Sequence, residues 1–375
     1  MFVLRSSATG SSRILLAATF GKSTISCSLS RFFSGTLPNM TSYQAWRVSQ
    51  LEDGSFQGSE TTLDTGKDLP TVGDGKNNNV LIKVTHSSLN FKDALSASGN
   101  KGVTRKFPHT PGIDAAGTLL GTGESVIVTG YDLGMNTAGG FGEYLRVPDT
   151  WVVKPNPFES PHRAMMYGTA GLTAGLSVQK LLAAGATPAQ GKVLVTGATG
   201  SVGSVAVEIL SKLGFQVVAV SGKADRYDIL HDLGAVEVVG REALETTKKP
   251  LVKPLFANAI DTVGGAPLAE LLKQIQPGGS VTCCGNVAGL GVETTVLPFI
   301  LRGINLLGVD SVEIPLEAKK EVWNKLAGEW ACPKTESMAK TIGRHELDVS
   351  LKAFLKGQSS GKLVLDHSLT PKSNL

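Results

Sequence analysis

The sequence predicts an α/β protein in which a β-rich domain is interrupted by a doubly wound parallel sheet and then resumed. Residues 80–155 hold short apolar or alternating runs separated by Gly, Pro and Asn, a pattern that indicates strands joined by turns. From about Gly168 to about Asn305, short apolar runs alternate with helical stretches. Runs of this kind, buried on both faces and joined by helices, are typical of a parallel sheet.

The expected elements fall into three groups along the chain. The first group contains strands only: Val80–Val84, Gly117–Leu119, Ser125–Val128, Tyr144–Val147 and Trp151–Lys154. The second group supplies the parallel sheet: Val193–Val195, Val217–Val220, Val236–Val239, Ala259–Ile260 and Val281–Cys283. The third group contains helices at Leu316–Leu326 and Val349–Leu355 and a strand at Leu363–Leu365. We therefore expect domains at residues 40–166 and 167–308, with residues 309–375 returning to the first domain.

Length and charge limit the possible classes of function. The chain has 375 residues, 41% of them hydrophobic and 18% charged, which is ordinary globular composition and enough for two domains. The net charge of +4 is carried by residues 1–40, and the remainder balances 32 basic against 32 acidic residues. This balance predicts no nucleic-acid partner. No apolar run approaches the roughly 20 residues that span a bilayer, so no membrane partner is expected.

Residues 1–39 are expected to form a mitochondrial targeting presequence. They are rich in Ser, contain scattered Arg and no acid, and carry a short apolar run at 14–18. Arg31-Phe-Phe-Ser34 resembles a mitochondrial processing site with cleavage after Phe33. We expect the mitochondrial matrix as the destination. A plastid stays open because composition separates the two poorly, and Met40 offers a second start that would give a cytosolic form.

The strongest local signal is a glycine-rich turn between a strand and a helix. Gly197, Gly200 and Gly203 follow the apolar run 193–195 and precede the apolar helix 205–213. The first glycine permits the tight turn, the second lets a pyrophosphate approach the backbone, and the third lets helix and strand pack closely. The helix N-terminus then offers free N–H groups to the phosphates. This context predicts a Rossmann dinucleotide site.

The end of the second strand of the sheet favours NADPH over NADH. Enzymes that use NAD place an acid there to hold the ribose 2′-hydroxyl. This chain has Ser221-Gly222-Lys223, with Arg226 and Arg241 nearby. A small hydroxyl, an open glycine and cations suit a 2′-phosphate.

The cysteines and histidines predict no metal site. The four cysteines lie at 27, 283, 284 and 332, and residues 41–200 contain none. Zinc ligation requires Cys or His clusters that this spacing does not offer. Without a metal, hydrogen bonds have to polarise the substrate, which favours reduction of an already polarised double bond over oxidation of an alcohol.

Several motifs make the resemblance to one superfamily specific. They lie at residues 87–95 (Ser-Ser-Leu-Asn-Phe-Lys-Asp-Ala-Leu), 111–117, 139–144, 168–174 and 361–364. In order and spacing they resemble the zinc-free medium-chain dehydrogenases/reductases, which include quinone oxidoreductases and the enoyl reductase units of fatty-acid synthases. The resemblance implies a GroES-like β-rich catalytic domain with an inserted Rossmann domain. Stretches 88–95, 217–222, 297–302 and 307–311 look closest to bacterial NADPH-dependent acrylyl-CoA reductases.

The resemblance also implies which residues contact the cofactor. These are Phe91 near the cofactor; Thr199, Gly200, Ser201 and Val202 around the pyrophosphate; Ser221, Gly222, Lys223 and Arg241 at the adenosine phosphate end; Asn286, Ile300 and Ser311 on the nicotinamide side; and Lys362 from the tail. In one departure from its relatives, which often have Tyr, this chain has Phe91. A tyrosine hydroxyl as proton donor at that position is therefore excluded.

Asn90 and Asp93 are the candidate catalytic residues. They are three apart, so they share a face if a helical turn begins there. Asn90 would orient the carboxamide or a bound water, and Asp93 would hold a protonated partner or relay a proton. Two readings of Asp93 stay open, the relay and the N-terminal cap of a short helix. Two readings also stay open for Lys101, Arg105 and Lys106: a solvated charge run, or a contact to the phosphates of coenzyme A.

The sequence thus predicts an NADPH-dependent reductase of the conjugated double bond of a short enoyl-CoA, with conversion of acryloyl-CoA to propionyl-CoA as the leading reading. A quinone or enone oxidoreductase with the same fold is the first alternative. A non-catalytic NADPH-binding structural protein is the second. A homodimer is expected from the resemblance alone.

Overall fold

The computed structural model describes residues 41–73, 78–358 and 361–371. The predicted presequence and the alternative start at Met40 lie outside these residues, so the targeting expectation stays a prediction. No helix in the described part of the chain is long and apolar enough to cross a membrane.

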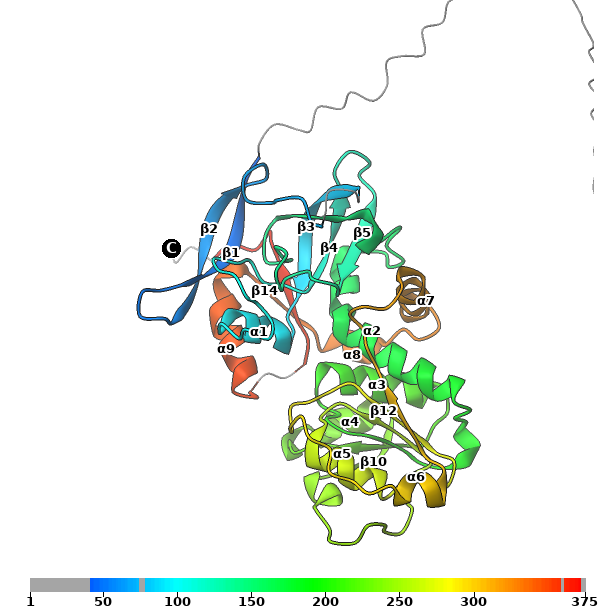
Figure 1. Cartoon of the computed structure of the whole chain (residues 1–375). Coiled ribbons are helices and arrows are strands. Elements are labelled where there is room, and N and C mark those ends of the chain that lie inside the picture. Colours follow the sequence, from blue (N-terminus) through cyan, green and yellow to red (C-terminus); the bar gives the residue numbers. More distant parts are fainter. Residues whose placement is uncertain (1–40, 74–77, 359–360, 372–375) are drawn as a thin grey trace, which may run out of the picture. The chain divides into compact units, whose positions relative to one another are not determined.

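The β-rich part contains a hairpin and a mixed sheet (Figure 1). The hairpin pairs β1 (Ser42–Gln50) with β2 (Phe56–Asp64). The sheet has the order β14-β15-β3-β4-β5-β7, and β6 also pairs with β3. Its strands are β3 (Asn79–Ser88), β4 (Asp114–Leu119), β5 (Ser125–Thr129), β6 (Tyr144–Pro148), β7 (Val152–Val153), β14 (Lys340–Ile342) and β15 (Leu363–Asp366). The last strand of the described chain therefore joins the sheet formed by the strands of the first domain, because β15 pairs with β3.

The second sheet is parallel and has the order β10-β9-β8-β11-β12-β13. Its strands are β8 (Val193–Val195), β9 (Val217–Val220), β10 (Ala235–Val239), β11 (Asn258–Asp261), β12 (Ser280–Cys283) and β13 (Asn305–Gly308). The chain moves outward in one direction from β8 and in the other direction from β11. The crossovers put α3 (Ser201–Lys212) and α4 (Tyr227–Asp232) on one face and α5 (Gly265–Leu272) on the other.

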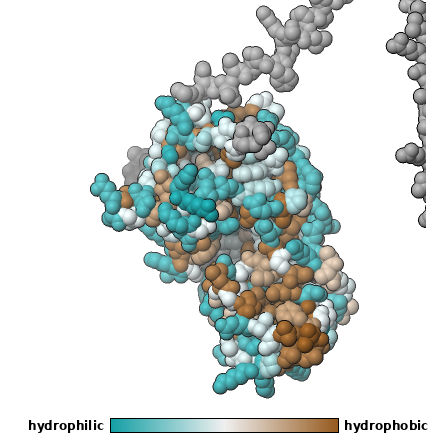
Figure 2. All heavy atoms as spheres, viewed as in Figure 1, coloured by the Kyte–Doolittle hydropathy of each residue, from teal (hydrophilic) through white to brown (hydrophobic). Residues whose placement is uncertain are grey.

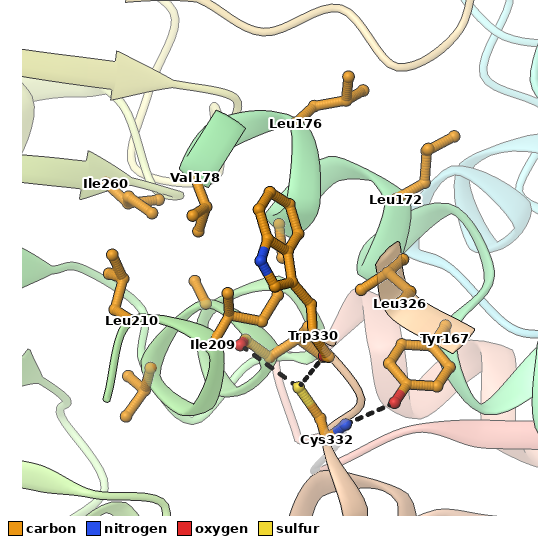
Figure 3. Close-up of a cluster of buried hydrophobic side chains, with 14 of the residues drawn as sticks. Tyr167, Leu172, Leu176, Val178, Ile209, Leu210, Ile260, Leu326, Trp330 and Cys332 are labelled. Carbon is orange, nitrogen blue, oxygen red and sulfur yellow. Dashed lines mark hydrogen bonds between the residues drawn. The ribbon is translucent and has the colours of Figure 1, made fainter. Parts of the chain in front are cut away.

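Alternate residues of the parallel strands pack into two separate hydrophobic cores, one on each face of the sheet. Val193, Val195 and Ile260 pack in the larger core with α2 (Pro161–Ala183), α3 and the segment around Trp330, as Figure 3 shows in part. Leu194 and Ala259 point into the other core, which they share with α5. Both faces of the sheet are therefore dry, which explains the continuous apolar runs of the sequence.

The remaining helices complete the covering of the sheets. They are α1 (Phe91–Ala97), α6 (Leu297–Arg302), α7 (Leu316–Ala327), α8 (Pro333–Ser337) and α9 (Leu347–Leu355). Helix α1 packs on α9, and α7 packs on α2.

The predicted fold class is confirmed, and the elements differ from expectation in a few places. The sequence reading missed the β1–β2 hairpin, β14 and β13. We expected the strand–helix rhythm to break near Asn305, which is wrong: β13 starts there and pairs parallel to β12. Three of the four residues of this strand are exposed, and it lies at the sheet edge, so it lacks a buried strand's apolar run. The predicted domain boundary at 166/167 falls inside α2, beside Gly168, whose φ of 53° and ψ of −157° interrupt the helix.

Candidate active site

The glycine turn after β8 has the geometry of a phosphate cradle. Gly197 has a φ of 58°, which favours glycine, and Gly200 is the N-cap of α3. A Cβ at Gly203 would lie 2.4 Å from the carbonyl oxygen of Gly197, so only glycine permits this approach. Ser201 and Val202 form the first turn of the helix, where backbone N–H groups lack intrahelical partners. These residues fit a dinucleotide pyrophosphate.

The predicted adenosine phosphate residues lie together at the carboxyl end of β9. The Ser221 hydroxyl lies 3.2 Å from the Thr199 hydroxyl and accepts a 3.1 Å hydrogen bond from the backbone N–H of Lys223. Gly222 lies against Arg241, because a Cβ there would be 2.4 Å from Arg241 Nε. The sheet therefore brings the hydroxyl, the open glycine and the guanidinium to one edge, beside the glycine turn.

Substitution of Gly222 by alanine is expected to weaken NADPH binding about 10-fold and NADH binding less than about twofold. The added methyl group displaces the Arg241 guanidinium, and a lost hydrogen bond to a charged group costs about 1.5–3 kcal/mol. Fluorescence titration with both dinucleotides measures the effect. Gly291→Ala is the matched control, because nothing lies within 4 Å of its Cβ position. Equal loss of NADPH and NADH binding in Gly222→Ala contradicts the assignment.

Asn90 and Asp93 form a capping box at the start of α1. Asn90 is the N-cap, and its backbone N–H donates to Asp93 Oδ2 at 2.7 Å. Asp93 Oδ1 accepts a 2.9 Å hydrogen bond from the backbone N–H of Ile113. Asp93 is fully buried. The capping reading of Asp93 therefore describes its contacts, while a role in proton transfer stays a prediction.

A second buried carboxylate, Asp114, is the centre of the polar cluster. Its Oδ2 accepts from the Ser88 hydroxyl, from Asn90 Nδ2 at 2.8 Å and from the backbone N–H of Thr169 at 2.8 Å. Its Oδ1 accepts from the Thr169 hydroxyl at 2.5 Å. Asp114 has no solvent exposure. Four donors aimed at one carboxylate hold it in place and fix the Asn90 amide, so Asn90 Oδ1 points away from Asp114.

Lys362 completes the cluster from the tail. Its Nζ donates to Asn90 Oδ1 at 3.4 Å, and only 4% of the residue is exposed. The carbonyl oxygen of the preceding Gly361 accepts a 3.3 Å hydrogen bond from Ser201 Oγ, at the start of α3. Lys362 therefore connects the candidate catalytic residues to the phosphate cradle.

The cluster holds two carboxyl groups and one ammonium in a dry site. Burial, followed by the neighbouring Asp114 charge, raises the pKa of Asp93 to about 7. Burial lowers the pKa of Lys362, and the charges of Asp114 and Asp93 oppose that shift. With Asp93 neutral, Asp114 and Lys362 compensate each other and the buried group carries no net charge. The arrangement keeps a proton on a carboxyl group at near-neutral pH.

We expect Asp93 to titrate near pH 7. Its folded pKa exceeds the usual 3.8, so its contribution to stability is fully present below about pH 4 and is lost as the pH rises to about 7. Infrared spectroscopy of the folded protein should show a protonated carboxyl band that disappears with a midpoint near pH 7. The band should be missing in Asp93→Ala. Its absence from the wild-type protein at pH 5.5 contradicts the charge assignment.

The predicted nicotinamide residues are only partly brought together. Asn286 follows the carboxyl end of β12, on the edge that carries the glycine turn, since Gly285 and Gly197 both lie against Thr262. Ser311 follows β13, and its hydroxyl lies 2.9 Å from that of Thr173. Phe91 is the first residue of α1 and is 38% exposed.

Ile300 lies apart from these residues. It is on α6, 68% exposed, and α6 ends where the Arg302 carbonyl accepts from the Gly278 N–H. This contact lies at the amino ends of β12 and β13, whereas dinucleotides bind at the carboxyl ends. The structure therefore does not place Ile300 with the other predicted nicotinamide residues.

Sequence reasoning missed Asp114, Ser88, Thr169 and Gly168. Asp114 could have been predicted from the sequence, because it is the one charged residue of a strand that is otherwise mostly apolar. A buried charged residue of this kind needs hydrogen-bond partners. Its donors could not be found in the same way: Thr169 is 55 positions away and meets Asp114 only through the tertiary fold.

Two family models match the chain. Residues 76–157 match the family model "Alcohol dehydrogenase GroES-like domain", and residues 201–328 match "Zinc-binding dehydrogenase". The described residues hold no group of three or more His, Cys, Asp or Glu side chains that could bind a metal.

Relatives cover almost the whole described chain. Acrylyl-CoA reductase AcuI of Ruegeria pomeroyi is 40% identical over 323 residues, 84% of this chain and 96% of its own length. Bacillus subtilis YhfP, which carries a quinone oxidoreductase name, is 41% identical over 308 residues, 80% and 92% of the two chains. Among solved structures, the Salmonella enterica yhdH oxidoreductase in complex with NADP superimposes with a TM-score of 0.81 at 39% identity, covering 86% of this chain and 99% of its own. YhfP with NAD bound gives 0.81 at 40% identity, covering 87% and 99%.

Proposed function

Because the chain belongs to the medium-chain dehydrogenase/reductase superfamily, and is an oxidoreductase, we propose that it reduces acrylyl-CoA to propionyl-CoA with NADPH. The observation that carries the proposal is the buried cluster of Asn90, Asp93, Asp114 and Lys362, joined to the phosphate cradle through Ser201 and Gly361. It offers a proton and an ammonium donor, and a metal-free reduction requires donors of this kind.

The cofactor is NADPH. The relatives were solved with both dinucleotides, NADP in one and NAD in another, so they do not decide between them alone. The segment Ser221-Gly222-Lys223 favours NADPH over NADH, because it has no acid that could bind a ribose hydroxyl and because Arg241 lies against Gly222. A 2′-phosphate finds a hydroxyl and cations there.

When bound, the reduced dinucleotide supplies a hydride to the β-carbon of the thioester substrate. The chain has two further tasks, which are to stabilise negative charge on the thioester oxygen and to protonate the α-carbon. Lys362 suits the first, because within the described chain its ammonium makes a single hydrogen bond, to Asn90. Asp93 suits the second, because it holds a proton up to about pH 7. Asn90 has its amide nitrogen committed to Asp114 and Ser88, so it orients Lys362.

A substrate panel tests the proposal. The purified full chain is assayed with NADPH and acrylyl-CoA, 1,4-benzoquinone or methyl vinyl ketone. We expect kcat/KM for acrylyl-CoA to exceed the other two by about 100-fold or more, equivalent to about 2.7 kcal/mol of transition-state discrimination. Quinone turnover that equals or exceeds acrylyl-CoA turnover would favour the first alternative, which the name of YhfP supports. Tight NADPH binding without turnover of any substrate would favour a structural protein.

We further propose a homodimer built on the edge of the parallel sheet. Strand β13 pairs only with β12 within the described chain, and Leu306 on it is 39% exposed. Beside it, Ile300 and Leu301 of α6 are 68% and 64% exposed, and Figure 2 shows a hydrophobic group over this helix. A second copy would continue the sheet and cover this apolar surface. Light scattering should give a dimer for the wild type and a monomer for Ile300→Asp/Leu301→Asp, and a wild-type monomer would contradict the proposal.

We also propose that residues 1–39 direct the chain to the mitochondrial matrix. A fluorescent protein fused to these residues should enter mitochondria. Delivery to plastids would support the alternative, and a cytosolic fusion would contradict both.

A further inference from the structure

The loop after α1 is attached to the candidate active site at both ends. At its start, the backbone N–H of Asn100 donates to Leu95 O, and the Thr104 hydroxyl lies 2.7 Å from that of Ser96, both within the last turn of α1. At its end, the N–H of Ile113 donates to Asp93. Residues 98–112 therefore form a strap whose two ends sit on the helix that carries Asp93.

The strap carries positive charge only. Between Asp93 and Asp114 the sequence contains Lys101, Arg105 and Lys106 and no acid, although the chain beyond residue 40 is balanced. All three cations are exposed, and none forms an ion pair with any residue that the structure describes. A local excess of positive charge in an otherwise neutral protein attracts anions.

The strap is held in place and not merely solvated. Lys101 Nζ lies over the rings of Phe56 and Phe107, at 5.6 and 5.1 Å from their centroids. The backbone N–H of Arg105 donates to Asn136 Oδ1, and Asn136 in turn donates to Asp132. The Lys101 side chain and the backbone at Arg105 are therefore ordered in advance, and groups ordered in advance lose less conformational entropy on binding.

The strap also lies at a suitable distance from the reacting group. Ser96 is six residues beyond Asn90, which is about 9 Å along a helix of 1.5 Å rise. Thr104 touches Ser96, so Arg105 lies near the far end of α1 from Asn90. A ligand that reacts at Asn90 and reaches Arg105 must carry its negative charge at the end of an arm about as long as this helix or longer. A coenzyme A thioester has this construction, because the pantetheine arm separates the acyl group from the phosphates.

We propose that Lys101, Arg105 and Lys106 bind the phosphates of the coenzyme A arm. The proposal rests on the proposed function, since it concerns the substrate of the same site. The Arg105 guanidinium donates two parallel hydrogen bonds to one phosphate, and the ammonium groups of Lys101 and Lys106 add positive charge. The strap thereby makes the enzyme select a phosphorylated thioester over a free enone or quinone.

The test compares acrylyl-CoA with acrylyl-pantetheine, which has the same acyl group and no phosphates. For the wild-type full chain, we expect KM for acrylyl-CoA to be about 10- to 100-fold lower, with similar kcat. In Arg105→Glu/Lys106→Glu, KM for acrylyl-CoA should rise toward the acrylyl-pantetheine value, because both charges now repel phosphate. Raising the salt concentration should increase the wild-type KM for acrylyl-CoA alone.

Lys248→Glu/Lys249→Glu is the matched control, with the same charge reversal on an exposed segment beyond β10. It should leave both KM values unchanged. The inference is overturned if KM in Arg105→Glu/Lys106→Glu rises equally for the two thioesters, or if it rises for neither.

A binding experiment separates this inference from the proposed function. Calorimetry with free coenzyme A should give about 10-fold weaker binding in Arg105→Glu/Lys106→Glu than in the wild type. If the wild type binds coenzyme A in this way but reduces no thioester, the proposed function fails and the phosphate site stands. If the wild type reduces acrylyl-CoA and the variant binds coenzyme A equally well, the phosphate site fails.

Discussion

Asp114→Asn is expected to destabilise the protein by about 3–5 kcal/mol and to remove most of its activity. The carboxylate accepts from Ser88, Asn90 and Thr169, and an amide in its place turns one accepting oxygen into a donor that faces their N–H and O–H groups. It also leaves Lys362 without its compensating charge, and breaking a buried pair at one partner has this cost. Urea unfolding and steady-state kinetics measure the two effects.

The same variant should change how activity depends on pH. The Asp114 charge is the second largest cause that raises the pKa of Asp93, after burial. Removing it lets Asp93 ionise at lower pH and pair with Lys362. The pH midpoint for loss of kcat should therefore move below 7 in Asp114→Asn. If Asp114→Asn is destabilised but keeps the wild-type pH midpoint for loss of kcat, Asp114 has a structural role and does not set the pKa of Asp93.

Asp149→Asn is the matched control for Asp114→Asn. Asp149 pairs with Lys154 at 2.5 Å, but 35% of each side chain is exposed. Exposed pairs of this kind contribute about 0–1 kcal/mol, so stability and the pH profile should change little.

Gly168→Ala is expected to destabilise the protein by about 2–6 kcal/mol, from backbone strain of about 1–3 kcal/mol and overpacking of similar size. Its φ of 53° and ψ of −157° suit glycine alone. The added Cβ would lie 2.1 Å from Ser88 Oγ, 2.5 Å from Asp114 Oδ2 and 3.0 Å from Lys362 Nζ. The polar cluster would have to open, so NADPH-dependent turnover should fall with the midpoint of thermal unfolding.

Gly185→Ala separates strain from crowding. Gly185 has a φ of 88°, but nothing lies within 4 Å of its Cβ position. It should lose only about 1 kcal/mol of stability and keep full activity. Activity in soluble Gly168→Ala equal to that of the wild type would contradict the role of the cluster.

The parallel sheet could be predicted well because its signals are local. Each of its buried strands is an apolar run beside a turn, and Gly197, Gly200 and Gly203 lie within seven residues of one another. Edge strand β13 has no such run, since three of its four residues are exposed. In the β1–β2 hairpin, polar residues interrupt the alternation of apolar residues that would indicate a strand.

The candidate site could be predicted only where one segment carries it. Asn90 and Asp93 are neighbours on one helical turn, so their spacing indicated a shared face. The rest of the cluster comes from β3, β4, α2 and the tail, which meet through sheet pairing and the bend at Gly168. Local periodicity contains no information on such contacts.

The fate of the nicotinamide hydrogen tests the proposed reduction of acrylyl-CoA directly. The full chain is incubated with acrylyl-CoA and NADPH that carries two deuterium atoms at C4, and the product is analysed by mass spectrometry and NMR. We expect propionyl-CoA with one deuterium at the β-carbon and an α-proton from solvent or from Asp93. Propionyl-CoA without deuterium, or no propionyl-CoA while benzoquinone is reduced, would contradict it.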